Sequence, residues 1–251
     1  MKAYDCKLIR KEEIAPGIFD FVIEAPEIAA ATKPGQFLHI DCGPSSFLRR
    51  PISICDAEDG MVRFIFQVKG EGTQSLSKFN VGDTINVMGP LGHGFEIKGR
   101  RPVIIGGGIG VFPLYKLAKQ TGGTVFLGFR DKSLVVMEDE FERVSDLVIV
   151  GTDNGSYGYD GYVADAMDGY LSRSDCDMIY ACGPKPMLKT VKAIAERRKI
   201  PCQLSLEQRM GCGIGACLVC TCETTHEGTD KHMRVCKTGP VFYSTEVTLN
   251  D

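Results

Sequence analysis

The sequence predicts a multi-domain protein made of an antiparallel β-barrel, an α/β domain with a parallel sheet and a small β-rich module. Three observations predict this architecture. Short runs rich in β-branched and aromatic residues fill the first hundred positions, between turn signals. From Pro102 onward apolar strands alternate with helical stretches, and after Pro201 glycine and cysteine dominate. We therefore expect domains at residues 1–99, 100–200 and 201–251.

The composition is that of an ordinary globular protein, and it excludes several classes of partner. A chain of 251 residues has room for one large or two to three small domains, at about 150 residues per domain. A net charge of -3 provides no basic surface for nucleic acid. No apolar run approaches the ~18 residues of a membrane helix. The charged amino terminus lacks the apolar segment of a signal peptide, so we expect a cytoplasmic location.

The strands of the first hundred residues and the turns between them predict a small antiparallel barrel, with a sandwich as the alternative. Pro34-Gly35, Asp59-Gly60 and Gly82-Asp83 are turn signals. The expected elements are strands at Phe19–Glu24, Phe37–Asp41 and Val62–Val68, a strand across Leu48–Ile54, a helix at Gln74–Phe79 and a closing loop at Gly89–Phe95.

The α/β domain is predicted from apolar runs that alternate with helical periodicity. Lys185–Lys199 has an apolar face and a basic end suited to a helix C-terminus. The expected strands are Val103–Ile105, Thr124–Phe129, Leu147–Val150 and Met178–Cys182, with helices at Val111–Gln120, Tyr162–Leu171 and Lys185–Lys199. Val241–Tyr243 and Glu246–Leu249 are expected strands of the last module.

Four cysteines near the carboxyl end have the spacing of an iron–sulfur site. Cys212, Cys217 and Cys220 form C-x4-C-x2-C, and Cys236 follows sixteen residues later, which is the plant-type [2Fe–2S] arrangement. The glycines at 211, 213 and 215 allow the loop to wrap around a cluster, because glycine tolerates positive φ. A structural zinc site is the first alternative, although zinc usually takes two separated C-x2–4-C pairs. A buried cysteine cluster without metal is the second.

The other seven cysteines are expected to be small buried hydrophobic residues. Without a secretion signal, disulfides are disfavoured. Cys222 is the ambiguous one, but using it in place of Cys220 would give C-x4-C-x4-C, so we assign it a packing role.

Two segments of the barrel have the residues needed to bind a diphosphate. Arg50 offers a charged fork and Ser53 a hydroxyl, on one predicted strand. Gly70-Glu-Gly-Thr73 precedes a predicted helix and would present amide groups to phosphate. The alternative for Arg50 is an arginine at a strand edge on the surface.

Two turns of the α/β domain are candidates for nucleotide binding. Gly106–Gly110 follows an apolar strand and precedes a helix, although its last glycine comes one residue earlier than in G-x-G-x-x-G. A plain tight turn is the alternative. Asp131, the nearest acidic residue downstream, is flanked by Arg130 and Lys132, which leaves NAD against NADP open. Cys182–Met187 ends a later strand, where ligands bind in such sheets, or simply starts a helix at a proline.

Together these motifs resemble the ferredoxin-reductase superfamily. The whole chain is similar to the electron-transfer (iron–sulfur flavoprotein) subunits of NAD-linked bacterial dihydroorotate dehydrogenase. The stretches that carry the resemblance are Leu48–Ile54, Gly106–Gly110, Cys182–Met187, Met210–Cys222 and Val235–Phe242.

The resemblance implies FAD, a [2Fe–2S] cluster and NAD as cofactors. It also implies a catalytic partner subunit with FMN and the dihydroorotate site, in a heterotetramer of two of each subunit. The residues that match the family's flavin positions are Arg50, Pro51, Ile52, Ser53, Ile65, Phe66, Gln67, Gly72 and Thr73. Those that match its nicotinamide-nucleotide positions are Gly107, Gly108, Gly110, Cys182, Gly183 and Met187. Those that match its cluster ligands are Cys212, Cys217, Cys220 and Cys236.

The resemblance further implies an electron relay from dihydroorotate, through the partner's FMN, the cluster and FAD, to NAD⁺. It requires no acid–base pair in this chain, and we assign surface or packing roles to His39, His93, His226 and His232. We expect the Gly211–Cys222 loop at the partner interface. The alternatives are a subunit of another NAD(P)H–ferredoxin reductase complex, such as a ferredoxin:NADP oxidoreductase, sulfhydrogenase or sulfite reductase, and a non-enzymatic, zinc-stabilised binding module. Gly-Pro-Val-Phe after Cys236 favours the dihydroorotate branch.

Overall fold

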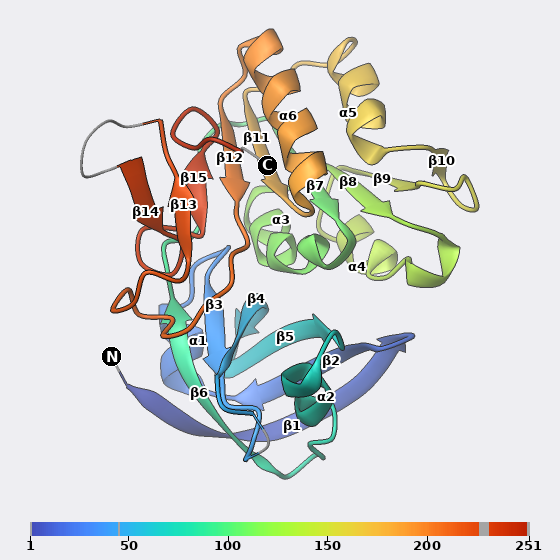
Figure 1. The fold of residues 1–251 in the computed structure, drawn as a ribbon. Coiled ribbons are helices and arrows are strands. Elements are labelled where there is room, and N and C mark those ends of the chain that lie inside the picture. The colour runs from blue at the N-terminus through green and yellow to red at the C-terminus, as the bar shows by residue number, and fades with distance from the viewer. Residues whose placement is uncertain (1, 45, 226–230, 250–251) are drawn as a thin grey trace.

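The computed structural model describes residues 2–44, 46–225 and 231–249. The chain forms a barrel, an α/β domain above it, and a carboxy-terminal module that lies beside both (Figure 1). His226, one of the histidines considered above, lies outside the described residues. No helix in the described part of the chain is long and apolar enough to cross a membrane.

The amino-terminal domain is a closed antiparallel barrel, as the sequence predicts. Its strand order is β1-β2-β5-β4-β3-β6, and side chains that alternate along the strands fill its interior. The strands are β1 (Ala3–Ala15), β2 (Ile18–Glu24), β3 (Phe37–Ile40), β4 (Arg50–Glu58), β5 (Met61–Gln67) and β6 (Thr84–Leu91), and the short helices are α1 (Pro26–Ala31) and α2 (Glu71–Leu76).

The second domain is built on a seven-stranded sheet with the order β10-β9-β8-β7-β11-β12-β15. All neighbouring strands are parallel except β12 and β15. The strands are β7 (Pro102–Gly107), β8 (Thr124–Phe129), β9 (Leu147–Thr152), β10 (Tyr159–Asp160), β11 (Met178–Cys182), β12 (Cys202–Ser205) and β15 (Val241–Tyr243), and the α-helices are α3 (Tyr115–Thr121), α4 (Glu138–Glu142), α5 (Val163–Leu171) and α6 (Lys185–Arg198).

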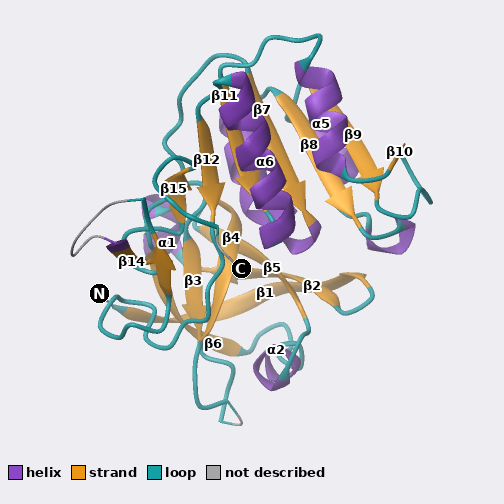
Figure 2. Cartoon of the chain, turned by 45° about the horizontal axis from the view of Figure 1, so that its top comes forward, coloured by secondary structure: helices purple, strands orange, loops and turns teal. Residues whose placement is uncertain are grey.

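Helices cover both faces of this sheet. Val103 and Ile105 of β7 pack in one apolar core with α5 and α6, whereas Ile104 packs in the other core with α3 and α4. Figure 2 shows α5 and α6 side by side on one face. Successive side chains of a strand point to opposite faces, so a fully apolar strand is what a sheet covered on both sides requires.

The expected domain ranges stay predictions, but the last one contains strands of two different sheets. β12 and β15 belong to the α/β sheet, whereas β13 (Thr221–Glu223) and β14 (His232–Arg234) form a separate two-stranded sheet. The strand expected at Glu246–Leu249 is absent. The chain turns at 244–246, and in this segment only Val247 pairs with another strand-like residue, Thr224, as a single β-bridge.

Several further elements differ from the sequence expectation, and β1, α1, α4 and β10 were not expected at all. The first three residues of the expected closing loop, Gly89–Leu91, are the end of β6. The expected helix at Val111–Gln120 is a 3₁₀ helix over Gly108–Leu114 followed by α3, because Pro113 has no N–H to continue an α-helix. Helix α2 begins before the expected Gln74.

Candidate cofactor sites

A cleft of about 810 Å³ opens where the parallel strands end, between the α/β domain and the barrel. Residues at the carboxyl ends of β7 and β8 and at the starts of α5 and α6 line one side. Ile18, Gln67 and Lys69 of the barrel line the other. Ligands bind at this edge of open α/β sheets, so the cleft lies where a nucleotide is expected.

Most of the predicted nucleotide-binding residues meet in this cleft. Gly107, Gly108, Gly110, Gly183 and Met187 all line it. The two turns that carry them pack against each other tightly. A β-carbon on Gly110 would lie 2.5 Å from the Cys182 carbonyl oxygen, and one on Gly107 would lie 2.7 Å from the Met187 sulfur. The glycines therefore allow the two turns to approach, in addition to leaving room for a ligand.

Cys182 behaves differently from the other residues predicted there. It is buried and does not line the cleft. Burial raises the pKa of its thiol to about 12, so the thiol stays protonated at neutral pH. Its backbone, pressed against Gly110, is what shapes the turn.

Several charged residues of the cleft were not singled out from the sequence. Glu207 and Lys69 face it from opposite domains. Surrounding protein atoms raise the pKa of the Glu207 carboxyl above its usual range, and Lys69 partly opposes this. A usable signal existed, since Glu207 lies just beyond the carboxyl end of β12, where sheet ligands are found.

Asp131 was the nearest acidic candidate for a ribose contact. Its carboxylate accepts hydrogen bonds from the Ser133 backbone N–H at 2.9 Å and from the Ser133 hydroxyl at 2.6 Å. These bonds lower its pKa and cap a short 3₁₀ helix, Lys132–Leu134. Arg130 lines the cleft, so the charge that this loop presents there is positive.

The predicted diphosphate residues come together from two separate segments of the barrel. Gly72, in the first turn of α2, lies under the Arg50 guanidinium, and a β-carbon there would lie 2.4 Å from Nε. The Thr73 hydroxyl accepts hydrogen bonds from the N–H groups of Lys69 at 2.9 Å and Gly70 at 3.2 Å, which fixes the turn. Among the described residues the Arg50 guanidinium donates only to the backbone carbonyl oxygens of Leu48 and Arg49 and has no acidic partner, so its charge is available to an anion.

The other predicted flavin residues lie along β4 and β5. Pro51 and Ser53 pair with His39 and Phe37 of β3, and Ile52 packs partly against the barrel core. Gln67 reaches the cleft, and Ile65 packs between the barrel and the α/β domain. Phe66 points into the barrel, where its ring contacts those of Phe19, Phe21 and Phe64, so only its backbone is free for a ligand.

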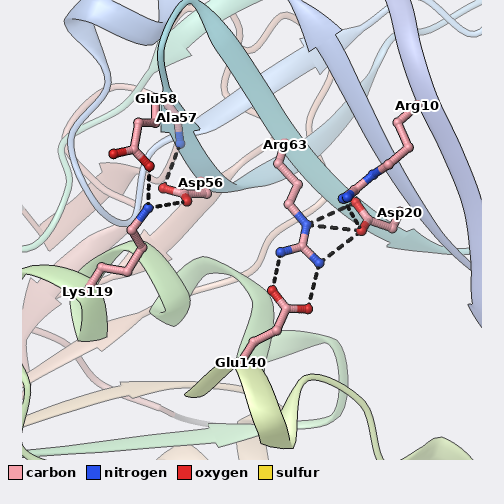
Figure 3. Close-up of polar contacts among 8 residues, drawn as sticks. All are labelled: Arg10, Asp20, Asp56, Ala57, Glu58, Arg63, Lys119 and Glu140. Atoms are coloured by element: carbon pink, nitrogen blue, oxygen red, sulfur yellow. Dashed lines mark hydrogen bonds and ion pairs between the residues drawn. The ribbon is translucent and has the colours of Figure 1, made fainter. Parts of the chain in front are cut away.

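Ion pairs hold the barrel and the α/β domain in fixed relation next to the cleft. Arg63 of β5 bonds both oxygens of Glu140 on α4, at 2.5 and 2.9 Å, and also bonds the buried Asp20 of β2 (Figure 3). Lys119 of α3 bonds Asp56 and Glu58 of β4, each at 2.7 Å. These two sets of ion pairs connect strands β2, β4 and β5 of the barrel to helices α3 and α4 of the α/β domain.

The four predicted ligand cysteines lie together as two pairs. The Cys220 and Cys236 sulfurs are 3.1 Å apart, and the Cys217 N–H donates to the Cys212 sulfur at 3.3 Å. Burial raises the pKa of Cys212, but backbone N–H donors outweigh it and bring the value to about 6. Gly215 N–H donates to the Cys236 sulfur at 3.1 Å. Two thiolates for each of two irons, with amide donors to sulfur, is what a [2Fe–2S] cluster requires.

A single metal ion fits these residues less well. Nowhere in residues 2–44, 46–225 and 231–249 do three or more His, Cys, Asp or Glu side chains form a ready site for one ion. Cys222 is buried on β13 with no role in either pair, in agreement with its assigned packing role. Positive φ at Gly213 (69°) and Gly215 (79°) lets the loop turn back so that its amide groups face the sulfurs.

Comparison with known proteins agrees with this geometry. Residues 207–248 match the family described as "Iron-sulfur cluster binding domain of dihydroorotate dehydrogenase B". The "Dihydroorotate dehydrogenase B (NAD(+)), electron transfer subunit" of Caldanaerobacter subterraneus subsp. tengcongensis is 39% identical, over 96% of each chain. The protein of the same name from Geobacillus thermodenitrificans is 41% identical, over 96% of this chain and 97% of its own.

A solved structure is also similar along nearly the whole chain. It belongs to a study of flavin-based electron bifurcation by an NADH-dependent reduced ferredoxin-NADP oxidoreductase. The TM-score is 0.88 and the identity is 34%, with 97% of this chain and 90% of the other covered.

Proposed function

This chain belongs to the family of electron-transfer subunits of NAD⁺-linked dihydroorotate dehydrogenase B, and we propose that it passes electrons from a partner's FMN to NAD⁺ through its own [2Fe–2S] cluster and FAD. The partner is the catalytic dihydroorotate dehydrogenase subunit, and the assembly we propose contains two of each chain. All eleven cysteines are free thiols in the structure, which suits the reducing cytoplasm, where we place the complex.

The single observation that carries the proposal is the pairing of the four cysteines within the family-matched segment. Cys212 with Cys217, and Cys220 with Cys236, supply two thiolates to each of two irons. Backbone N–H groups already point at these sulfurs, so the loop would need little rearrangement to hold a cluster. The zinc-stabilised module, our earlier alternative, has no comparable support.

Each proposed cofactor has a fitting set of residues in the chain. Bound FAD would supply the exchange between a two-electron carrier and a one-electron carrier, because a flavin reacts in both ways. Arg50, with the turn formed by Gly72 and Thr73, would hold its diphosphate. Gly108 and Gly183 would hold the nicotinamide nucleotide in the cleft. The protein's part is to position these groups at fixed distances.

The cluster loop has the surface expected for partner contact. Leu218 is 72% exposed, Val219 54% and Ile214 40%, and all three lie between or beside cluster ligands. Apolar side chains grouped on the surface commonly mark protein interfaces. An exposed cluster edge also shortens the path to another protein's cofactor. We therefore propose that Gly211–Cys222 contacts the catalytic subunit.

The test is electron transfer in the reconstituted complex. Anaerobically purified subunits are mixed, dihydroorotate is added, and NADH formation is followed by absorbance. Cys217→Ser should retain FAD but lose NADH formation, whereas Cys222→Ser, a change at a neighbouring packing cysteine, should keep both. Iron and acid-labile sulfide in equal amounts are expected in the wild-type protein. If NADH forms equally in the Cys217→Ser complex, the proposed relay is wrong.

A second candidate function is supported by one specific observation. The similarity to the ferredoxin-NADP oxidoreductase structure extends over nearly the whole chain. On that basis the chain would serve another NAD(P)H–ferredoxin reductase complex. The discriminating measurement is which donor reduces the bound FAD: dihydroorotate with the FMN subunit, or reduced ferredoxin without it.

A further inference from the structure

His39 lies on the wall of the barrel that faces the cluster module. It is part of β3, whose Leu38 and Ile40 point into the barrel core. Its neighbour Phe37 points the other way, into an apolar core that also contains Cys220 and Cys236. Since side chains alternate along a strand, His39 also points toward the module. Figure 1 shows β3 next to the carboxy-terminal segment.

The ring of His39 is in contact with the cluster loop itself. A β-carbon on Gly213 would lie 2.6 Å from Nδ1, 2.9 Å from Cγ and 3.1 Å from Cε1. The Gly213 backbone therefore rests on the imidazole, one residue after the ligand Cys212. No larger residue could take this position while the ring stays where it is.

Both ring nitrogens lack a hydrogen-bond partner. The residue is 1% exposed, and neither Nδ1 nor Nε2 has a partner within 3.5 Å and at good geometry in the described part of the protein; only the Arg49 backbone lies near enough to raise the ring's pKa, against the stronger lowering by burial. An imidazole carries at least one N–H in every protonation state, so at least one donor is buried without an acceptor. Leaving such a group unsatisfied is costly, and buried polar groups are almost always paired.

The cluster is the group best placed to supply the missing acceptor. Its sulfides and ligand thiolates accept hydrogen bonds, and the loop that would hold it touches the ring. The loop's own N–H groups already donate to the Cys212 and Cys236 sulfurs. A donor from the barrel would complete this set from the opposite side.

We propose that His39 is a positioning residue of the iron–sulfur site, whose ring N–H donates a hydrogen bond to a sulfur atom of the bound cluster. The inference rests on the proposed cluster. A hydrogen bond to sulfur stabilises the more negative, reduced cluster and raises its reduction potential. His39 also pairs with Pro51 on the predicted flavin strand, so this contact joins the two cofactor sites.

The experiment is a redox titration of the holoprotein, with the cluster followed by electron paramagnetic resonance and FAD by absorbance. His39→Leu should lower the cluster potential by a tenfold change in the reduction equilibrium, about 59 mV for one electron. His39→Gln keeps an N–H donor, so its cluster potential should lie between those of His39→Leu and the wild type. His93→Gln is the matched control, because the His93 ring is exposed and bonded to the Lys237 carbonyl oxygen at 2.8 Å.

A second measurement is made on the wild-type chain, so it does not depend on whether a His39 variant folds correctly. Labelling with ¹⁵N-histidine should give a weak nitrogen coupling to the reduced cluster that persists in His93→Gln. An unchanged cluster potential in His39→Leu, a shift confined to FAD, or no histidine coupling would each overturn the inference. Absence of iron and sulfide would instead overturn the proposed function, so the two failures are distinct.

Discussion

Replacing Arg63 with glutamine should weaken the junction between the barrel and the α/β domain. Arg63 is 15% exposed and bonds two carboxylates from different domains. Asp20, one of them, is only 2% exposed, and its second cation is Arg10 at 2.6 Å, whose side chain is 49% exposed. Arg63→Gln thus leaves a buried carboxylate with one half-exposed partner.

The expected cost follows from these exposures. Removing one member of a buried ion pair typically costs about 3–5 kcal/mol, because the remaining charge stays desolvated. Arg10 still compensates Asp20, so we expect about 3 kcal/mol, the lower end. Arg10→Gln removes the more exposed partner of the same carboxylate and should cost about 1 kcal/mol or less.

The assay is urea unfolding of the FAD-loaded protein, with both variants compared at equal m-values. A double-mutant cycle of Arg63→Gln with Glu140→Gln should give a coupling of about 1–3 kcal/mol. If Arg63→Gln costs no more than Arg10→Gln, or the cycle is additive, then the ion pairs do not hold the two domains together and the reasoning fails.

Three further predictions concern single positions. Gly72→Ala should weaken FAD binding, measured by flavin fluorescence, about tenfold or more, since its β-carbon would displace the Arg50 guanidinium. Gly169→Ala on α5, outside both proposed cofactor sites, should leave that affinity unchanged. In the cluster-free protein, burial, and then the charge of Arg49, lower the His39 pKa from 6.5 to about 4, so the stability of that form is full above pH 6.5 and declines toward pH 4. In urea titrations the cluster-free wild type should lose about 1 kcal/mol of unfolding free energy between pH 7 and 5.5, and cluster-free His39→Gln should not; equal losses would refute this. Gly169→Ala on α5, where the added carbon meets nothing, should raise the unfolding free energy by about 0.5–1 kcal/mol in the same titrations, and a decrease would contradict it.

The sequence was most informative where local chemistry decides the structure. Runs such as Thr124–Phe129 and Met178–Cys182 became strands with the expected limits, because nothing but a doubly covered strand suits so short and apolar a run. The grouping of the four cysteines was predicted for a related reason, since their spacing brings three of them onto one loop, whereas their division into two pairs is visible only in the structure. Short strands and turns indicated a barrel or a sandwich, and the structure shows that the sheet closes into a barrel.

What the sequence did not reveal depends on residues far apart in the chain. Arg50 meets Gly72 only after the barrel closes, and Glu207 reaches the cleft only because β12 joins the sheet beside β11. The orphaned nitrogens of His39 were equally hidden. A lone histidine on a strand has no local signal that tells a packing role from a role beside a cofactor, and its contact with Gly213 spans two domains.

The sheet connects the proposed nucleotide and cluster sites mechanically. Cys182, at the turn that shapes the cleft, pairs with Ser205 of β12, and the chain continues from there through Glu207 into the cluster loop. After the last cluster ligand the chain returns to the same sheet as β15, where Phe242 pairs with Leu204. The two segments that connect the cluster module to this sheet are therefore held side by side by the β12–β15 pairing. This fixed attachment suits electron transfer over constant distances between the proposed nucleotide and cluster sites.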